Sequence, residues 1–309
     1  MYGVLNPSVE EMQLKSAYVE DGFADWRLLV SIIKPSEQDP FRELSLKWNA
    51  KCHPHFVGAL MRARDNVFIE SSGIALTPNG ERIGYHIKNS VDVPQIRNLD
   101  EFGVVRVKLT AFEFFRQRKE NCVEVYSRSV LIPNGDAPAL LAATTSAVVA
   151  VAVFKHVHYA EMKKLTRIVR SREKQSQSQS LRTNSIATDA SSLTSSSTSS
   201  SESAPTSSSS LSSTSTLSTS CALCNGSGLS FTNSKKKHCR ICCLRVCSRC
   251  RVTKTLFVPT EQEKQLSRID MTFCTRCMLS ASCASSAKFA VLDVLAAEDK
   301  LVDYAEALR

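Results

Sequence analysis

Hydrophobic and polar residues alternate along much of the first half of the chain, with the period of two that is typical of half-buried β-strands. This pattern predicts strands at residues 44–51, 67–76, 82–90, 104–116 and 122–131. The turn-forming triplet Pro-Asn-Gly follows two of these segments, at residues 78–80 and 133–135. We therefore expect an antiparallel sheet of several strands.

Helical signals lie on both sides of these strands. Ser8 precedes Glu11 by three residues ahead of an apolar run, which is the capping-box start of a short helix. A second helix is predicted over residues 24–33, ending before Pro35. A long closing helix is predicted over residues 138–172, apolar in its first half and basic in its second. Helices, an antiparallel sheet and a closing helix together predict an α+β fold.

The closing helix begins in residues 137–154, a run of 18 residues without a charged side chain. A membrane-spanning helix needs about 20 strongly apolar residues, whereas this run is mostly Ala and Val and includes Thr144, Thr145 and Ser146. A helix in a soluble core is therefore favoured, with a membrane span as the alternative. The first residues lack a basic segment followed by an apolar one, so we expect no signal peptide and a cytoplasmic protein.

The middle of the chain has low complexity. Between Ser191 and Ser220, 24 of 30 residues are Ser or Thr. Such a segment cannot bury enough apolar surface to offset the entropy of ordering, so residues 173–220 are expected to form a disordered linker. A plain spacer is favoured over a phosphorylation tract. The chain then divides into an N-terminal domain at 1–172, the linker, a cysteine-rich unit at 221–285 and a helix at 286–309.

The cysteine-rich unit contains ten of the twelve cysteines, all between residues 221 and 283. In a protein kept in a reducing compartment, this clustering indicates metal ligands rather than a disulfide framework. Eight of the cysteines form four Cys-x-x-Cys pairs, whose spacing lets both thiolates of a pair reach one Zn²⁺. The predicted ligands are Cys221, Cys224, Cys239, Cys242, Cys247, Cys250, Cys274 and Cys277.

The gaps between the four pairs are 14, 4 and 23 residues. Because the second gap is so short, the second and third pairs cannot belong to separate units. The spacing favours a cross-braced arrangement, in which the first and third pairs bind one ion and the second and fourth bind another. Each site would be closed by four thiolates, which is typical of structural rather than catalytic zinc. We therefore expect two Zn²⁺ ions and no enzymatic activity.

The segment Lys-Lys-Lys-His-Cys-Arg-Ile-Cys at residues 235–242 resembles the signature of FYVE-type zinc fingers, with Cys243 where that family has Gly. The resemblance implies binding of phosphatidylinositol 3-phosphate and a peripheral location on endosomal membranes. It assigns the lipid head group to four basic residues, Lys235, Lys236, His238 and Arg240. The charge of this segment also favours an acidic ligand. Residues 235–254 contain eight Lys or Arg and no Asp or Glu, within a chain of formal net charge +9.

A second resemblance lies in the N-terminal domain. Residues 63–74, followed by Arg-Ile-Gly-Tyr at 82–85 and Ser-Val-Asp-Val-Pro at 90–94, are similar to the later half of START-like lipid-binding domains. This resemblance implies a helix-grip fold, in which an antiparallel sheet holds a C-terminal helix and an apolar lipid can occupy the space between them. The match covers about residues 8–170, so such a domain would be incomplete at its N-terminal side.

These observations predict a zinc-binding adaptor that attaches to anionic, phosphoinositide-bearing membranes. The alternative is a zinc-stabilised protein-interaction module, similar to a ubiquitin-ligase finger, without lipid specificity. Nucleic acid is disfavoured because the basic run at 235–254 has no aromatic side chain on which bases could stack. The apolar periodicity after the finger predicts a terminal helix that packs on its own domain rather than on a second chain.

Overall fold

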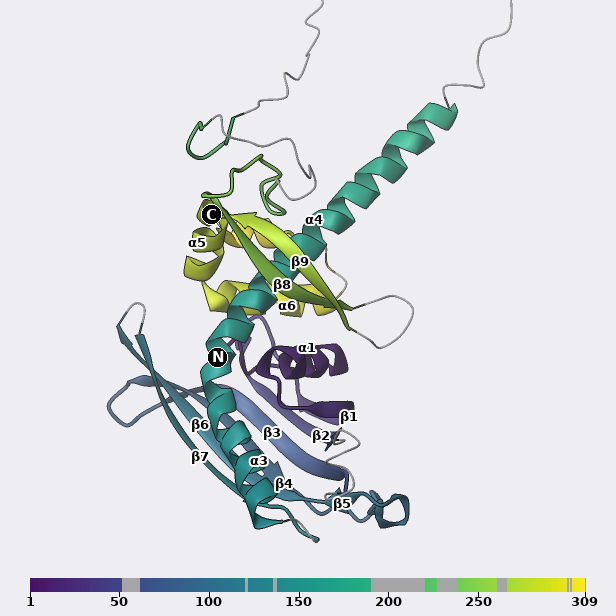
Figure 1. Ribbon diagram of the computed structural model, residues 1–309, viewed down its shortest axis with the longest axis vertical. Coiled ribbons are helices and arrows are strands. Elements are labelled where there is room, and N and C mark those ends of the chain that lie inside the picture. Colours follow the sequence, from purple (N-terminus) through teal and green to yellow (C-terminus); the bar gives the residue numbers. More distant parts are fainter. Residues whose placement is uncertain are drawn as a thin grey trace, which may run out of the picture.

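The computed structural model describes residues 1–51, 62–119, 122–135, 138–189, 220–226, 238–259, 266–298, 300 and 302–308. It has the predicted α+β architecture. One large sheet carries helices on one face, and a cysteine-rich unit lies against the middle of a long helix that rises from this face (Figure 1).

The large sheet is antiparallel except at one short strand. Its strands are β1 (Phe23–Ile33), β2 (Glu43–Lys51), β3 (Arg64–Leu76), β4 (Arg82–Ser90), β5 (Val105–Arg106), β6 (Lys108–Lys119) and β7 (Cys122–Ile132). The order is β1-β2-β3-β4-β6-β7, and β5 pairs in parallel with β3. All five predicted strands are confirmed, although the segment predicted at 104–116 is divided into β5 and β6.

The helix predicted at 24–33 is wrong, because this segment is β1. Its residues pair with β2 from Phe23↔Lys51 to Ile33↔Leu44, with three register shifts along the way. Val30, Ile32 and Ile33 are β-branched and favour the extended state. Apolar residues at several spacings made the periodicity ambiguous, and the cross-strand partner decided the conformation.

The helices of the N-terminal domain are α1 (Val9–Val19), α3 (Ala139–Ala152) and α4 (His156–Asp189), with short 3₁₀ turns η1 (Asp100–Phe102) and η2 (Val153–Lys155). The predicted cap of α1 is confirmed, since the Ser8 side chain accepts a hydrogen bond from the Glu11 backbone N–H. The closing helix is also present, interrupted by η2. It does not stop at residue 172, so the first part of the predicted linker is helical and the remainder, up to residue 219, lies outside the described residues.

Helix α3 is less buried than the core-helix prediction requires. Leu140 is 76% exposed and Val151 is 53% exposed, while Val153 at the end of the apolar run is buried. The side chains at 141, 142, 145, 148 and 149 lie outside the described set. The core position expected for this run is therefore met at Val153 and is not met at Leu140 or Val151.

The sheet face beneath α1 and α4 is filled with charged side chains. Lys47 is fully buried, and its ammonium lies 2.6 Å from both Glu43 and Glu70. His86 lies between Glu70 at 2.7 Å and Glu113 at 3.0 Å. Such ion pairs need mutual hydrogen bonding to offset the loss of hydration. The described residues thus fill this layer with a polar network, where a START-like fold would place an apolar tunnel.

The described residues of the cysteine-rich unit and the C-terminal segment include two strands and three helical segments. These are β8 (Arg251–Pro259), β9 (Leu266–Cys274), α5 (Thr275–Cys283), α6 (Ser286–Ala297) and η4 (Tyr304–Leu308). The predicted terminal helix is therefore α6 followed by η4, packed on the same chain as expected. No single helix among the described residues is long and apolar enough to cross a membrane; α5 and α6 pass that test only as a pair, with a bend of 85° between them.

The cysteine-rich unit packs directly on the N-terminal domain. The Tyr18 hydroxyl accepts a hydrogen bond of 2.9 Å from the Phe257 backbone N–H, and the two rings meet edge to face at 4.9 Å. On α4, the Lys164 ammonium donates to the Ala284 carbonyl at 2.6 Å. Although the sequence predicts a flexible connection, these contacts join the two parts into one hydrophobic core.

A buried carboxylate organises this junction. Asp293 on α6 accepts hydrogen bonds from the hydroxyls of Tyr2 at 2.8 Å and Tyr304 at 2.6 Å. The Arg167 guanidinium lies 2.9 Å from Asp293 and the Lys163 ammonium lies 3.6 Å away. Burial opposes ionisation of Asp293, but Arg167 and Lys163 outweigh it, so the pKa of this carboxyl is below its usual value.

Replacing Asp293 with Asn should destabilise the whole chain. Two cations on α4 would lose a buried counter-charge, and breaking such a pair costs about 3–5 kcal/mol of unfolding free energy. Urea denaturation at neutral pH measures this change. Glu298→Gln is the matched control, since Glu298 pairs with Lys300 at the surface and its loss should cost less than about 1 kcal/mol.

The same substitution should also alter the acid response. A carboxyl with a lowered pKa stabilises the fold above its ordinary pKa, and that contribution disappears as pH falls through the folded-state pKa. The Asp293→Asn variant lacks this contribution, so the stability difference between wild type and variant should shrink on acidification. An equal difference at neutral and acidic pH would contradict this role of Asp293.

Candidate metal centre

The eight predicted cysteines form two groups in space. One contains Cys221, Cys224, Cys247 and Cys250, and the other contains Cys239, Cys242, Cys274 and Cys277. Within each group all four sulfur atoms lie within 4.8 Å of one another. The cross-braced pairing is therefore confirmed, and Cys243 and Cys283 lie outside both groups, as expected.

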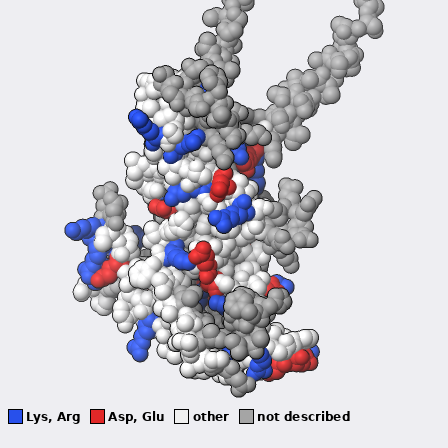
Figure 2. Space-filling model, in the orientation of Figure 1, with Lys and Arg blue, Asp and Glu red and all other residues white. Residues whose placement is uncertain are grey.

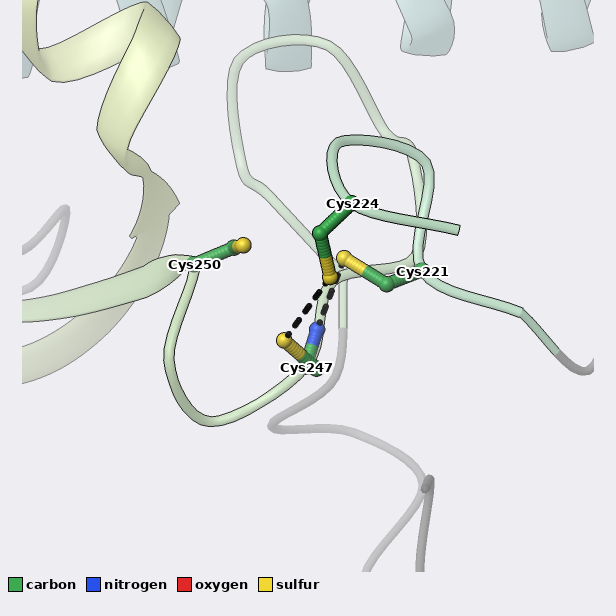
Figure 3. A group of neighbouring side chains, drawn as sticks. All are labelled: Cys221, Cys224, Cys247 and Cys250. Atoms are coloured by element: carbon green, nitrogen blue, oxygen red, sulfur yellow. Dashed lines mark hydrogen bonds between the residues drawn. The ribbon is translucent and has the colours of Figure 1, made fainter. Parts of the chain in front are cut away.

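The first group is built from two tight turns. After Cys224, Asn225 adopts a left-handed backbone with φ of 54°, and its N–H donates to the Cys221 carbonyl at 2.8 Å. The third pair approaches from the other side, and the Cys247 backbone N–H donates to the Cys221 sulfur at 3.3 Å. The four sulfur atoms converge on one point between the two turns (Figure 3).

The second group repeats this turn and adds a helix. The Cys243 N–H donates to the Cys239 carbonyl at 2.9 Å, with Cys243 at a left-handed φ of 60°. Cys274 caps the N-terminus of α5, and its sulfur accepts from the Cys277 backbone N–H at 3.3 Å. Cys239, Cys274 and Cys277 are buried, so this group is more enclosed than the first, in which Cys224 is exposed.

The hairpin of β8 and β9 fixes one group relative to the other. Strand β8 begins directly after Cys250 of the first group, and β9 ends in Cys274 of the second. Arg251 lies opposite Cys274 in the strand register, and the Thr275 N–H donates to the Cys250 carbonyl at 3.0 Å. The two groups are thus linked by backbone hydrogen bonds, so distortion of one should reach the other.

The donor set fits Zn²⁺. Four converging sulfurs are the ligands of closed, structural zinc sites. Burial opposes ionisation of the Cys221 thiol, but backbone N–H groups, that of Cys247 foremost, outweigh it and lower its pKa to about 6. Because the thiolate is the metal-binding form, this environment favours metal binding at neutral pH. Neither group leaves a position for substrate among its four sulfurs.

The predicted head-group residues fall in two sets. Lys235 and Lys236 lie outside the described residues. His238 and Arg240 are described, and both are exposed beside the second zinc group. His238 forms an isolated antiparallel bridge with Arg245, which brings a third basic residue to this turn.

Sequence reasoning did not assign Arg245 to the site. Its Nε atom is buried and has no hydrogen-bond partner among the described residues. Its position in the sequence could have indicated this role. Arg245 lies between the second and third cysteine pairs, in a run of basic residues that contains no acid. A buried guanidinium donor without an acceptor is a feature that an anionic ligand could satisfy.

Comparison of the chain with protein-family models and with curated proteins found no match. The resemblances to FYVE-type and START-like domains therefore stay predictions.

The purified chain should contain two zinc ions, measurable by elemental analysis together with protein concentration. Cys224→Ser should weaken the first group, because it removes one of four thiolates, and the variant should retain fewer than two ions. Cys283→Ser is the matched control and should retain two, since Cys283 belongs to neither group. One ion or none in the wild type would contradict the assignment.

Cys243→Gly should stabilise the zinc-loaded protein by about 1 kcal/mol, because a side chain at a left-handed φ is strained and Gly is not. Asn225→Gly occupies the corresponding position of the first turn and should have a smaller effect, since Asn tolerates this conformation. Thermal unfolding with zinc present compares the two variants. A loss of stability in the Cys243 variant would overturn this account of the turn.

Proposed function

We propose that the finger attaches the protein to anionic membranes by binding a phosphoinositide head group, phosphatidylinositol 3-phosphate in the resemblance to FYVE-type fingers. The observation that carries the proposal is the exposed pair His238 and Arg240, with His238 bridged to Arg245, whose Nε has no hydrogen-bond partner among the described residues. Phosphate oxygens are the natural acceptors for such donors, and Arg can bind them through two parallel hydrogen bonds.

The electrostatics of this surface favour an acidic partner. No Asp or Glu occurs between residues 238 and 259. Near an anionic leaflet each Lys or Arg contributes about 1 kcal/mol of attraction. Figure 2 shows Lys and Arg side chains on the upper part of the molecule, below the grey atoms, with a few Asp and Glu side chains among them. The acid-free segment itself is what supports an anionic partner in this proposal.

The location of the finger supports this role. The described cysteine segments that are drawn in green in Figure 1 lie on the side of the β8–β9 hairpin that is turned away from the large sheet. The finger is held there by its contacts with α1 and α4. In this proposal zinc takes no part in lipid contact; its role is to hold in place the turn that carries His238 and Arg240 on either side of Cys239.

Two contributions to lipid binding should be separable. Nonspecific attraction of exposed cations is screened over about 8 Å at physiological ionic strength, whereas hydrogen bonds from a buried donor are screened much less. Thr272 and Phe273 precede Cys274, so an Arg that FYVE-type fingers carry there is missing. We therefore expect the nonspecific contribution to dominate, with weak discrimination among phosphoinositide isomers.

Liposome sedimentation of the zinc-loaded full chain tests the proposal. Binding to vesicles containing phosphatidylinositol 3-phosphate should fall steeply between low and physiological salt. Arg245→Ala and Arg240→Ala should remove any isomer preference and keep two zinc ions. Arg268→Ala, which removes an equal charge from β9 on the same finger, should preserve the preference. No binding to any anionic vesicle at low salt would exclude the lipid function and favour the protein-interaction alternative.

A further inference from the structure

Strand β7 is a terminal strand of the large sheet, and its outer edge has no partner strand among the described residues. All of its residues are exposed except Leu131, and Tyr126 at its centre is 58% exposed. An unprotected edge offers a row of free backbone N–H and C=O groups, which is a template for pairing with another strand.

The two terminal strands of the sheet differ in regularity. Strand β1 has three register shifts against β2, and such irregularities twist an edge and hinder further pairing. Strand β7 pairs with β6 without interruption from Ile132 to Val123, and its one shift lies at the hairpin end. Of the two edges, only β7 therefore has the regular backbone that an added strand requires.

The side chains of β7 indicate what that added strand is. Arg128 is exposed and has no hydrogen-bond or ion-pair partner within the described part of the chain. Glu124 lies on the same face of the strand, four residues earlier, with Tyr126 between them. Within the described part of the chain, the contacts of Glu124 with Arg118 and Arg116 reach its Oε2 atom, which leaves Oε1 for another donor.

We infer that this chain self-associates through antiparallel pairing of β7 with β7 of a second copy, centred on Tyr126. In this register Tyr126 lies opposite its counterpart, and Glu124 of each copy lies opposite Arg128 of the other. Two ion pairs therefore flank one aromatic pair, and cross-strand pairs of both kinds stabilise a sheet. The surface is self-complementary about a two-fold axis, as an isologous dimer requires.

Other registers lack this match. A one-residue slip turns the apolar faces of the two sheets to opposite sides. A two-residue slip in either direction places both charges opposite uncharged residues, for example Glu124 opposite Val130. A four-residue slip places Arg128 opposite Arg128 or Glu124 opposite Glu124. The arrangement centred on Tyr126 is the one in which every β7 charge has an opposite charge as its partner.

The outer face of the sheet favours the same pairing. Phe112 and Phe114 of β6 lie beside Tyr126 on the face turned away from α1 and α4, and the ring centroids of Phe112 and Tyr126 are 6.2 Å apart. In the paired arrangement these aromatic side chains of both copies would form one continuous row. The β6–β7 hairpin projects at the left of the molecule in Figures 1 and 2, where charged side chains of both signs are visible.

Sedimentation velocity of the zinc-loaded full chain over a dilution series tests this inference. The wild type should show a monomer–dimer equilibrium. Arg128→Glu places like charges opposite each other twice and should raise the dimer dissociation constant by at least about tenfold. Lys119→Glu, a charge reversal on the neighbouring strand β6, is the control and should leave the constant unchanged.

A charge swap distinguishes this register from any other contact. The double variant Glu124→Arg with Arg128→Glu restores both ion pairs in reversed order, so its dissociation constant should return close to that of the wild type. Circular dichroism and thermal unfolding establish that each variant is folded. A wild type that is monomeric at every concentration, an Arg128→Glu variant that still dimerises, or a double variant that stays monomeric would each overturn the inference.

Discussion

The carboxylate of Asp293 lies where the N-terminal segment, the long helix α4 and the C-terminal helices meet. It accepts from Tyr2 and Tyr304 and faces Arg167 and Lys163, which also contact Glu11 on α1. These groups are largely out of water, so each depends on the others for its hydrogen bonds. The cysteine-rich unit is therefore anchored to α1 and α4, and its orientation relative to the large sheet follows from this cluster.

This anchoring also fixes the position of the two cysteine groups. A finger on a flexible tether would sample many orientations. This cysteine-rich unit is instead held against α4, where Lys164 donates to the Ala284 carbonyl. The β8–β9 hairpin joins both cysteine groups, and its Phe257 contacts Tyr18 on α1. If two chains pair through β7, two fingers belong to one assembly, and the proposed attachment of each finger to a membrane would then be bivalent.

The two faces of the large sheet differ in polarity, and the charged face is the one covered by helices. The face under α1 and α4 carries Lys47, Glu70, His86 and Glu113 in a connected network. The opposite face carries aromatic and aliphatic residues that remain partly exposed, such as Ile87, Phe114 and Tyr126. Buried ion pairs specify one arrangement of helices on the sheet, since a shifted helix would leave charges unpaired. The exposed apolar face is a surface that association could cover.

Much of this molecule could be predicted from local patterns. Alternation of polar and apolar residues located the strands from β2 to β7, because residues on successive sides of a strand meet different environments. The Cys-x-x-Cys spacing and the short gap between Cys242 and Cys247 led to the cross-braced ligand sets, because few pairings allow four sulfurs to meet. These features depend on residues close in sequence or on strict ligand geometry.

Tertiary structure decided the rest. Residues 24–33 contain apolar side chains compatible with a helix, and pairing with β2 made them β1. The contact of Asp293 with Tyr2 joins residues at opposite ends of the chain, and Arg245 gained its place beside His238 through a bridge. The spacing of apolar residues and the spacing of metal ligands are local properties that can be read directly from a sequence. Which charged side chains meet in the interior depends on how the elements pack, and only the folded chain determines that.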